Sequence, residues 1–230
     1  DIYRQEGMDV EFVGHPLAEK IGSSMERSEF FQRHGWDIDL KLLALFPGSR
    51  KQEVENILPT MVEAASKLRT SHKLQIAVGV APNLGVDLLR SYIADREGIV
   101  IVQNSTYDLM HHADAAIVTS GTATLETGWF ATPMVMVYKT SPVTFAIGRM
   151  LVGVPYIGLV NIVAGKKVVP ELIQHDLTPD KLCKEVKRLI EDDEYARLMR
   201  SELSVIKSKL GGPGASAKVA EGIISLGEAA

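Results

Sequence analysis

Hydrophobic residues along the chain form two alternating patterns, short continuous runs and longer stretches in which they recur at spacings of three and four. The run 42–46 stops at Pro47-Gly48, and the stretch 54–68 that follows shows the wider spacing. Short apolar runs bounded by turn residues predict buried strands, and the spacing of three and four predicts one face of an amphipathic helix. On this basis we expect strands at 42–46, 74–78, 99–102, 115–118, 134–138 and 156–159, with helices at 54–68, 84–93 and 125–130.

The order of these elements predicts an α/β fold. Strands that alternate with helices and are apolar on both faces are typical of a parallel sheet covered by helices on both sides. We therefore expect a Rossmann-like, doubly wound parallel sheet over residues 41–180. Residues 1–40 are polar and irregular apart from a strand predicted at 10–13, and residues 181–230 show only helical spacing, broken at 211–214.

The charge balance and the cysteine count exclude several classes of protein. The chain carries 25 Lys and Arg against 29 Asp and Glu, a formal net charge of −4, which argues against broad nucleic-acid binding. A single cysteine, Cys183, can form neither an internal disulfide nor a zinc site of several thiolates, as expected in a reducing, cytoplasmic setting. The longest uncharged stretch, 150–165, is interrupted by Gly153 and Pro155, so we expect no membrane-spanning helix, and the first residues show no signal peptide.

The loop after the first predicted strand carries residues suited to an anionic ligand. In a doubly wound sheet, ligands bind at the carboxyl ends of the strands, where the first N–H groups of helices are free to bind anions. Gly48 lets the backbone approach a ligand, Ser49 offers a hydroxyl, and Arg50 offers a guanidinium that can pair with a phosphate or carboxylate. The alternative is an ordinary strand-to-helix turn in which Ser49 caps the helix.

A second loop of this kind follows the strand predicted at 115–118. Gly121 lets the backbone reach an anion at the start of the next helix, and Ser120 and Thr122 can add hydrogen bonds. Glu126 lies one turn into that helix, where its carboxylate can accept hydrogen bonds from a pair of hydroxyls such as a ribose diol. The alternative is a capped helix in which Glu126 is a favourable charge in the first turn.

Other features of the sequence argue against further sites. The loop 103–107 ends another strand and could present backbone groups to a base, but its composition does not demand this and favours an ordinary turn. Ser105 with Asp108 resembles a helix N-terminal capping pair. The chain lacks a G-x-G-x-x-G fingerprint after its first strand, a P-loop and a G-x-S-x-G elbow. His111 and His112 are adjacent on a predicted helix and cannot chelate one metal together. We therefore expect neither a bound metal nor a cofactor.

Six short tracts give the chain a family resemblance. They are 12–16 (FVGHP), 45–50 (LFPGSR) followed by Glu53, 113–126 (ADAAIVTSGTATLE), 133–135 (PMV), 161–166 (NIVAGK) and 170–174 (PELIQ). In this order they resemble the lipid-A-disaccharide synthase family, which are glycosyltransferases of the two-domain GT-B type. The S-G-T tract recurs among GT-B enzymes, and its combination with P-G-S-R and N-x-x-A-G-[RK] makes the resemblance specific from about residue 10 to residue 180.

The resemblance implies an inverting hexosyltransferase reaction in lipopolysaccharide biosynthesis. The family transfers 2,3-diacylglucosamine from UDP-2,3-diacylglucosamine to 2,3-diacylglucosamine 1-phosphate, which gives the β-1,6-linked lipid A disaccharide 1-phosphate and UDP. By this resemblance the chain is the C-terminal, donor-binding half of such an enzyme. Residues 1–40 are then an inter-domain segment, residues 41–180 the UDP-sugar-binding domain and residues 181–230 a helical tail.

The resemblance also implies roles for individual residues. Arg50, together with helix N–H groups, would stabilise the negative charge on the leaving UDP. Lys166 stands where the family often has Arg, and an ammonium cannot make the bidentate phosphate contact of a guanidinium. The residues implied in catalysis are Arg50, Asn161 and Gln174, and those implied in donor binding are Gly48, Ser49, Arg50, Ser120, Gly121, Thr122, Glu126 and Lys166.

Further expectations concern the rest of the enzyme. The acceptor cleft, a membrane-facing apolar patch and the general base would belong to an N-terminal domain, which we expect to lie outside residues 1–230. We therefore expect this chain alone to bind UDP or its sugar and to turn over negligibly. The intact enzyme would lie in the cytoplasm, peripheral to the inner membrane, with no nucleic-acid partner. The helical tail predicts a homodimer, and the apolar stretch 143–154 favours burial in the core over contact with lipid.

Two alternatives remain open from the sequence. One is another GT-B enzyme that uses a UDP-sugar, such as the N-acetylglucosaminyltransferase that forms lipid II or a UDP-N-acetylglucosamine 2-epimerase. These families share the S-G-T tract and the later glutamate but not the tracts at 161–166 and 170–174. The other alternative is a non-catalytic nucleotide-binding module.

Overall fold

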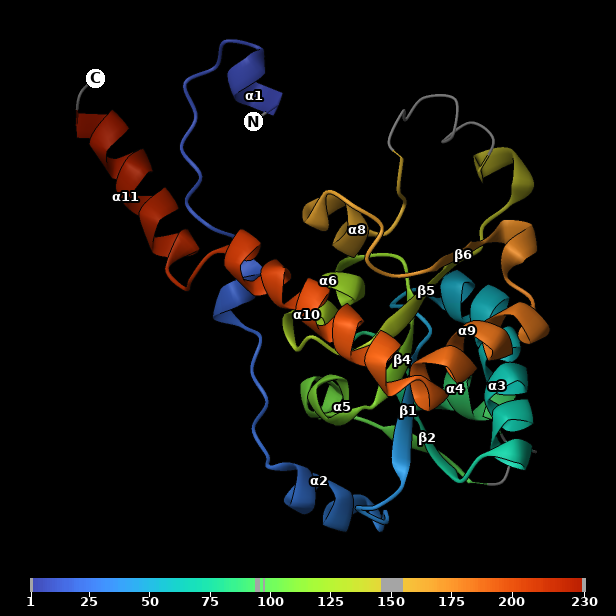
Figure 1. The fold of residues 1–230 in the computed structure, drawn as a ribbon. Helices are drawn as coiled ribbons and strands as arrows, with labels where there is room; N and C mark the ends of the chain where they lie inside the picture. Colours follow the sequence, from blue (N-terminus) through green and yellow to red (C-terminus); the bar gives the residue numbers. More distant parts are fainter. Residues whose placement is uncertain (1, 94–95, 97, 146–154, 229–230) are drawn as a thin grey trace.

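A parallel sheet forms the centre of the computed structural model, which describes all residues except 1, 94–95, 97, 146–154 and 229–230 (Figure 1). The strands are β1 (Lys41–Phe46), β2 (Leu74–Gly79), β3 (Ile99–Val102), β4 (Ala115–Thr119), β5 (Met134–Tyr138) and β6 (Glu171–Ile173). Their order is β3-β2-β1-β4-β5-β6, and all neighbouring strands run parallel. The order reverses at the β1–β4 pair, which is the topological switch point of the sheet. The predicted doubly wound parallel sheet is confirmed.

The central strands are buried on both faces, as their uninterrupted apolar sequence requires. Residues 42–46 of β1 are all buried, and β4 is buried along its whole length. Leu43 lies opposite Ile76 on β2 and opposite Ala115 on β4, so side chains from three strands meet at one level of the core. Burial of each Leu or Ile side chain stabilises the fold by about 1.5–3 kcal/mol.

Helices cover both faces of the sheet. They are α3 (Lys51–Ser71), α4 (Val86–Ile93), α5 (Thr106–His112), α6 (Thr122–Trp129), α8 (Leu159–Ala164), α9 (Pro179–Glu191) and α10 (Asp193–Leu210), with the short 3-10 helix η2 (Gln174–Asp176) before α9. α3 packs with α4 and α9, whereas α6 packs with α5 and α8 (Figure 1). Right-handed crossovers place these two groups on opposite faces of the sheet, and α10 lies against α6, α8 and α9. The helical spacing predicted beyond residue 179 is confirmed.

The structure corrects the predicted sixth strand. Residues 156–159 do not join the sheet: α8 begins at Leu159, and β6 pairs with β5 instead. The backbone N–H groups of Ile157 and Gly158 donate to the carboxylate of Glu171 at 3.1 and 2.9 Å. A side chain of β6 therefore satisfies the N–H groups that a strand here would have offered to β5. The apolar stretch predicted to be buried lies largely in 146–154, outside the described residues.

The N-terminal residues lie outside the sheet. The N-terminal segment contains the helices α1 (Ile2–Gln5), η1 (Pro16–Glu19) and α2 (Arg27–His34). The strand predicted at 10–13 is wrong, because these residues pair with no described strand and Phe12 is 66% exposed. α2 is the part that joins the core, since Phe30 and Phe31 are fully buried.

The N-terminal segment and the last helix, α11 (Ala215–Glu228), extend from the body together. Figure 1 shows α11 and the first residues reaching away from the sheet in the same direction, with both chain ends there. The two segments are joined at their base, where His15 N–H donates to Leu210 O at 2.8 Å and Ser216 donates to the Glu19 carboxylate from its N–H and its hydroxyl, both at 2.8 Å. The predicted break at 211–214 separates α10 from α11.

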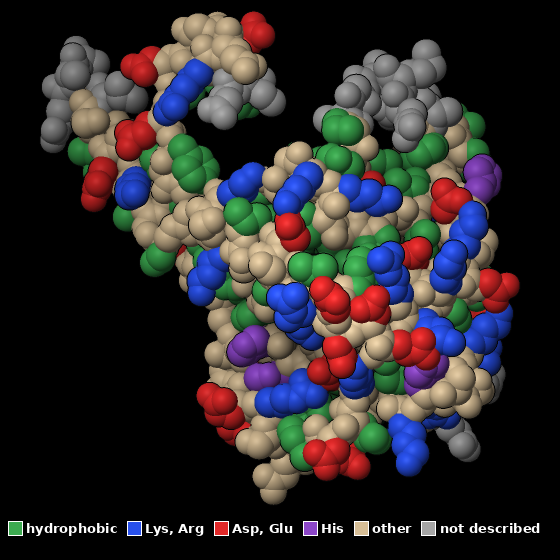
Figure 2. Space-filling view, viewed as in Figure 1, with side chains coloured by type: hydrophobic (Ala, Val, Ile, Leu, Met, Phe, Trp, Pro, Cys, Tyr) green, Lys and Arg blue, Asp and Glu red, His purple; other side chains and the backbone are tan. Residues whose placement is uncertain are grey.

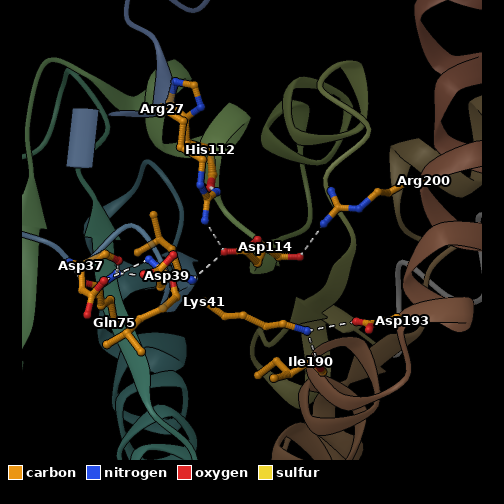
Figure 3. A network of polar contacts seen from close by, with 12 residues as sticks. Arg27, Asp37, Asp39, Lys41, Gln75, His112, Asp114, Ile190, Asp193 and Arg200 are labelled. Atoms are coloured by element: carbon orange, nitrogen blue, oxygen red, sulfur yellow. Dashed lines mark hydrogen bonds and ion pairs between the residues drawn. The ribbon is translucent and has the colours of Figure 1, made fainter. Parts of the chain in front are cut away.

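A network of polar contacts fixes the amino end of the sheet, where the central strands begin (Figure 3). The Asp114 carboxylate, just before β4, accepts hydrogen bonds from Arg27 of α2 at 2.9 Å and from the backbone N–H of Leu42 in β1 at 2.8 Å. Arg200 of α10 donates to the Asp114 carbonyl oxygen at 3.1 Å. Asp114 thus ties two peripheral helices to the start of the central strands.

Candidate functional site

A cavity of about 770 Å³ opens at the carboxyl end of the sheet, around the switch point between β1 and β4. Its walls are the loops that follow β1, β2, β3 and β4, the first turns of α5 and α6, and part of the segment before α2. The two loops predicted from the sequence therefore meet in one place. The predicted site residues that line the cavity are Gly48, Ser49, Arg50, Ser120, Gly121, Thr122 and Glu126.

The loop after β1 binds the carboxylate of Glu53, a residue of the helix that follows the loop. Glu53, in the first turn of α3, accepts hydrogen bonds from the N–H groups of Ser49 (3.0 Å) and Arg50 (3.3 Å), and its other oxygen pairs with Arg50 Nη1 at 2.7 Å. Gly48 has a φ of +112°, and a Cβ there would clash with the Glu53 carboxylate, so the turn needs glycine. The N-cap of α3 is Arg50 rather than Ser49. The loop therefore presents N–H groups and a guanidinium, which are the groups that bind phosphate.

The loop after β4 leads into α6 through an open glycine. Gly121, the N-cap of α6, has a φ of +144°, and no atom lies within 4 Å of the place a Cβ would take. The first N–H groups of a helix have no acceptor within the helix, so those at the start of α6 are available to an anion. The Ser120 hydroxyl donates to Ile157 O at 3.2 Å, whereas Thr122 is exposed at the cavity.

Thr119, the last residue of β4, lines the same cavity and is 2% exposed. Its Oγ1 is the buried side-chain polar atom without a hydrogen-bond partner among the described residues. A buried hydroxyl without a partner costs about 1–3 kcal/mol, so such an atom beside a cavity is suited to a ligand.

Glu126 forms the inner wall of the cavity together with Tyr107. Burial raises the pKa of Glu126, and the hydrogen bond that it accepts from the Tyr107 hydroxyl (3.2 Å) opposes this. Burial and the nearby Glu126 charge raise the pKa of Tyr107 to about 12, so the phenol stays protonated and donates. The arrangement leaves Glu126 able to accept from hydroxyl groups of a ligand.

The structure places Asn161 outside the cavity lining. Asn161 is fully buried, and its amide oxygen accepts from the N–H groups of Val168 (2.8 Å) and Val169 (2.9 Å). Its amide nitrogen donates to Val169 O at 3.0 Å and to the Glu171 carboxylate at 2.9 Å. Every hydrogen-bonding atom of this side chain thus joins α8 to the start of β6.

Lys166 and Gln174 are also absent from the residues that line the cavity. Lys166 pairs with Glu202 on α10. The Gln174 side chain accepts from the N–H of Thr140 at 2.8 Å and donates to Thr140 O at 3.1 Å, which fixes the backbone just after β5. Neither contact reaches the loops after β1 and β4.

Two groups of residues at the cavity escaped the sequence analysis. Asn83, after β2, donates to Ser49 O at 2.7 Å, and it follows a strand end in the same way as the predicted loops do. Asp108 was predicted as a capping partner of Ser105, but the Ser105 side chain makes no cap hydrogen bond. The Asp108 carboxylate instead accepts from the N–H groups of Ser24 (2.7 Å) and Met25 (2.9 Å). These segments are far apart in the sequence, so no local sequence pattern predicts the contact.

Charge on the molecular surface is mixed. Figure 2 shows Lys and Arg side chains interspersed with Asp and Glu over the helices that face the viewer. Within the part of the chain that the structure describes, no helix combines the length and apolar character needed to cross a membrane.

The chain resembles characterised proteins in sequence and in fold. A family profile described as "Lipid-A-disaccharide synthetase" matches residues 1–212. The lipid-A-disaccharide synthase of Syntrophus aciditrophicus is 42% identical over 222 residues, which are 95% of this chain and 58% of that relative. The chain thus spans well under two thirds of the relative's length.

Solved structures share the fold at low sequence identity. A glycosyltransferase from Rickettsia africae superposes with a TM-score of 0.61 at 9% identity, over 86% of this chain and 50% of that one. UDP-GlcNAc 2-epimerase from Neisseria meningitidis, solved with UDP-GlcNAc bound, gives a TM-score of 0.57 at 13% identity, over 86% of this chain and 49% of that one. These likenesses show the Rossmann-like fold of GT-B glycosyltransferases.

Proposed function

The chain belongs to the lipid-A-disaccharide synthetase family, and we propose that it binds the UDP-sugar donor of a glycosyltransferase reaction in lipid A biosynthesis. The observation that carries the proposal is the meeting of two loops suited to bind an anion and a half-buried carboxylate in one cavity at the switch point of the sheet. The diphosphate would lie between the loop of Ser49 and Arg50 and the start of α6. The ribose would lie at Glu126, and the loop 103–107, which lines the same cavity, would contact the base.

The geometry supports a chemical role for Arg50. In the proposed reaction the 6-hydroxyl of the acceptor attacks the anomeric carbon of the donor and gives its proton to the general base that the family resemblance places in an N-terminal domain. The bond from the anomeric carbon to the β-phosphate oxygen breaks. Negative charge then builds on the departing UDP. The Arg50 guanidinium and the N–H groups now held by the Glu53 carboxylate are fixed donors for that charge, so a phosphate would replace Glu53 as their acceptor.

The identity of the sugars rests on the family. We propose UDP-2,3-diacylglucosamine as donor and 2,3-diacylglucosamine 1-phosphate as acceptor. Contact with the inner membrane and residence in the cytoplasm are proposals of the same kind. The fold likeness to UDP-GlcNAc 2-epimerase keeps an unacylated UDP-sugar as the alternative. Competition binding with acylated and unacylated UDP-glucosamine separates the two, because the proposal expects the acylated sugar to bind more tightly.

Because the chain covers 58% of its relative, binding is a sharper test of the donor site than turnover. Isothermal titration of the 230-residue chain with UDP should give one site. Arg50→Ala should weaken UDP binding about 10- to 100-fold, since it removes a charge-assisted hydrogen bond.

Lys51→Ala is the matched control, because Lys51 is an exposed neighbour that pairs with Glu55 and does not line the cavity. Absence of UDP binding to the unmodified chain would contradict the donor site. Equal effects of the two substitutions would remove Arg50 from it.

A further inference from the structure

Tyr107 and Glu126 form a hydrogen-bonded pair across the wall of the cavity. Tyr107 lies in the first turn of α5, just after the loop that ends β3, and Glu126 lies in α6. The Tyr107 hydroxyl donates to Glu126 Oε1 at 3.2 Å. Both residues line the cavity, and both are half-buried. The pair therefore joins the loop expected near a base to the carboxylate expected near a ribose.

The Tyr107 ring is held from behind. Its centroid lies 6.3 Å from that of Phe130, which in turn stacks on His111 at 5.1 Å. This packing places Phe130 beside the ring, while the Tyr107 hydroxyl is directed at Glu126. Among the described residues, the Tyr107 hydroxyl keeps this direction without a hydrogen bond from another side chain.

The Glu126 carboxylate has one oxygen engaged and one free. Among the described residues, Tyr107 is its single hydrogen-bond donor, and no Lys or Arg pairs with it. A half-buried carboxylate that lacks a cationic partner depends on its hydrogen bonds for both orientation and charge. The oxygen without a protein donor is therefore the one that can accept from a ligand.

We propose that Tyr107 is a positioning residue of the donor site, which holds Glu126 Oε1 so that the second carboxylate oxygen faces the cavity and accepts the hydroxyls of a ribose. The inference rests on the proposed nucleotide site and extends it to selectivity. Tyr107 does not itself need to touch the ligand. Its effect should appear only with ligands that carry ribose hydroxyls.

The test compares UDP with 2′,3′-dideoxy-UDP, which keeps the base and the diphosphate. Tyr107→Phe should weaken UDP binding about tenfold, the size of one hydrogen bond to a charged group, and change dideoxy-UDP binding less than twofold. The loss for UDP should grow as the pH falls from 8 to 6, because Glu126 without its donor takes up a proton more readily. Glu126→Gln should show the same selectivity, and the double variant should add little to either single one.

Tyr195→Phe is the matched control, because Tyr195 lies on α10 away from the cavity lining. Thermal unfolding of each variant confirms that it folds. An equal loss for both ligands in Tyr107→Phe, or no loss for either, overturns the positioning role. If the unmodified chain binds no UDP at all, the proposed nucleotide site fails first, and the two failures are thus distinguished.

Discussion

Two buried threonines show how strongly the value of a hydroxyl depends on its partner. Thr132 is fully buried and donates to Met110 O at 2.6 Å, whereas Thr119 is almost fully buried and its hydroxyl has no partner among the described residues. Valine has nearly the shape of threonine, so it removes the hydroxyl without leaving a cavity.

Thr132→Val should lower the free energy of unfolding by about 1–3 kcal/mol, because it leaves the Met110 carbonyl buried without a donor. Thr119→Val should raise the free energy of unfolding by up to about 1–3 kcal/mol, since it removes a buried hydroxyl that has no partner and breaks no hydrogen bond. Urea denaturation of the two variants measures both values. A loss in Thr119→Val as large as that in Thr132→Val would mean that the Thr119 hydroxyl has a partner in solution.

Asp108 makes stability depend on pH. Burial by itself would raise the pKa of this carboxyl, but hydrogen bonds from the backbone of Ser24 and Met25 and from the hydroxyls of Ser23 and Ser24 hold it below its ordinary value of 3.8. A carboxyl with a depressed pKa in the folded state stabilises the fold above its unfolded pKa, and that contribution is lost as the pH falls through the folded value.

Asp108→Asn should therefore destabilise the chain by about 2 kcal/mol at pH 7, and the difference from the unmodified chain should shrink below about pH 4. Unfolding by urea at pH 7, 5 and 3 measures this. Asp87→Asn is the control, because Asp87 lies on α4 and its side chain is 94% exposed. A difference as large at pH 3 as at pH 7 would show that the carboxylate charge is not what stabilises the contact.

At the scale of elements, α8 and β6 form a unit held by the side chains of Asn161 and Glu171. Asn161 places all its polar atoms on Val168, Val169 and Glu171, and Glu171 in turn accepts from the backbone before α8. This unit pairs with β5 at the edge of the sheet.

Asn161→Ala should lower the free energy of unfolding by about 3 kcal/mol, because several buried groups lose their partner at once. Ile162→Ala, on the same helix but 41% exposed, should cost much less. Denaturation curves of both variants decide the matter. If Asn161→Ala were as stable as Ile162→Ala, Asn161 would not be needed for stability. The role that the family resemblance implies for Asn161 would then be chemical.

The elements that could be predicted from sequence are those whose buried residues form a clear local pattern, either a continuous apolar run or a long apolar helix face. β1 and β4 are apolar throughout because helices cover both faces, and α3 shows its apolar face over many turns. β6 is three residues long and carries Glu171, so it has no such pattern, and the apolar residues 156–159 attracted the prediction instead. Only the pairing with β5 shows that residues 171–173, and not residues 156–159, form the edge strand.

The candidate site divides in the same way. Gly48, Arg50 and Gly121 were accessible to prediction because they stand at strand ends, where the topology brings loops together, and Glu126 because it lies one turn into the helix that follows such a loop. Tyr107 and Thr119 were missed because their interest lies in a missing or a single partner, which only the fold reveals.

At the scale of the whole molecule, α11 is packed loosely on the body. Val219, Ile223 and Ile224 are 48%, 65% and 61% exposed, and α11 contacts the body through η1. Removing residues 217–230 should therefore change the free energy of unfolding by no more than about 0.5 kcal/mol, as for other surface changes.

The same shortened chain tests the proposed homodimer. An exposed apolar helix favours self-association, so the full chain should show a concentration-dependent increase in mass by sedimentation equilibrium and the shortened chain should remain a monomer. Equal masses for both chains would assign any dimer to another surface.

The strand order also governs how the protein emerges from a ribosome. β1 is made before both of its neighbours in the sheet, since β2 begins at Leu74 and β4 only at Ala115. Until then the nascent chain carries an apolar strand with one open edge, the kind of edge that pairs with other chains. Residues 41–46 are therefore open to pairing with other chains until β4 has been made.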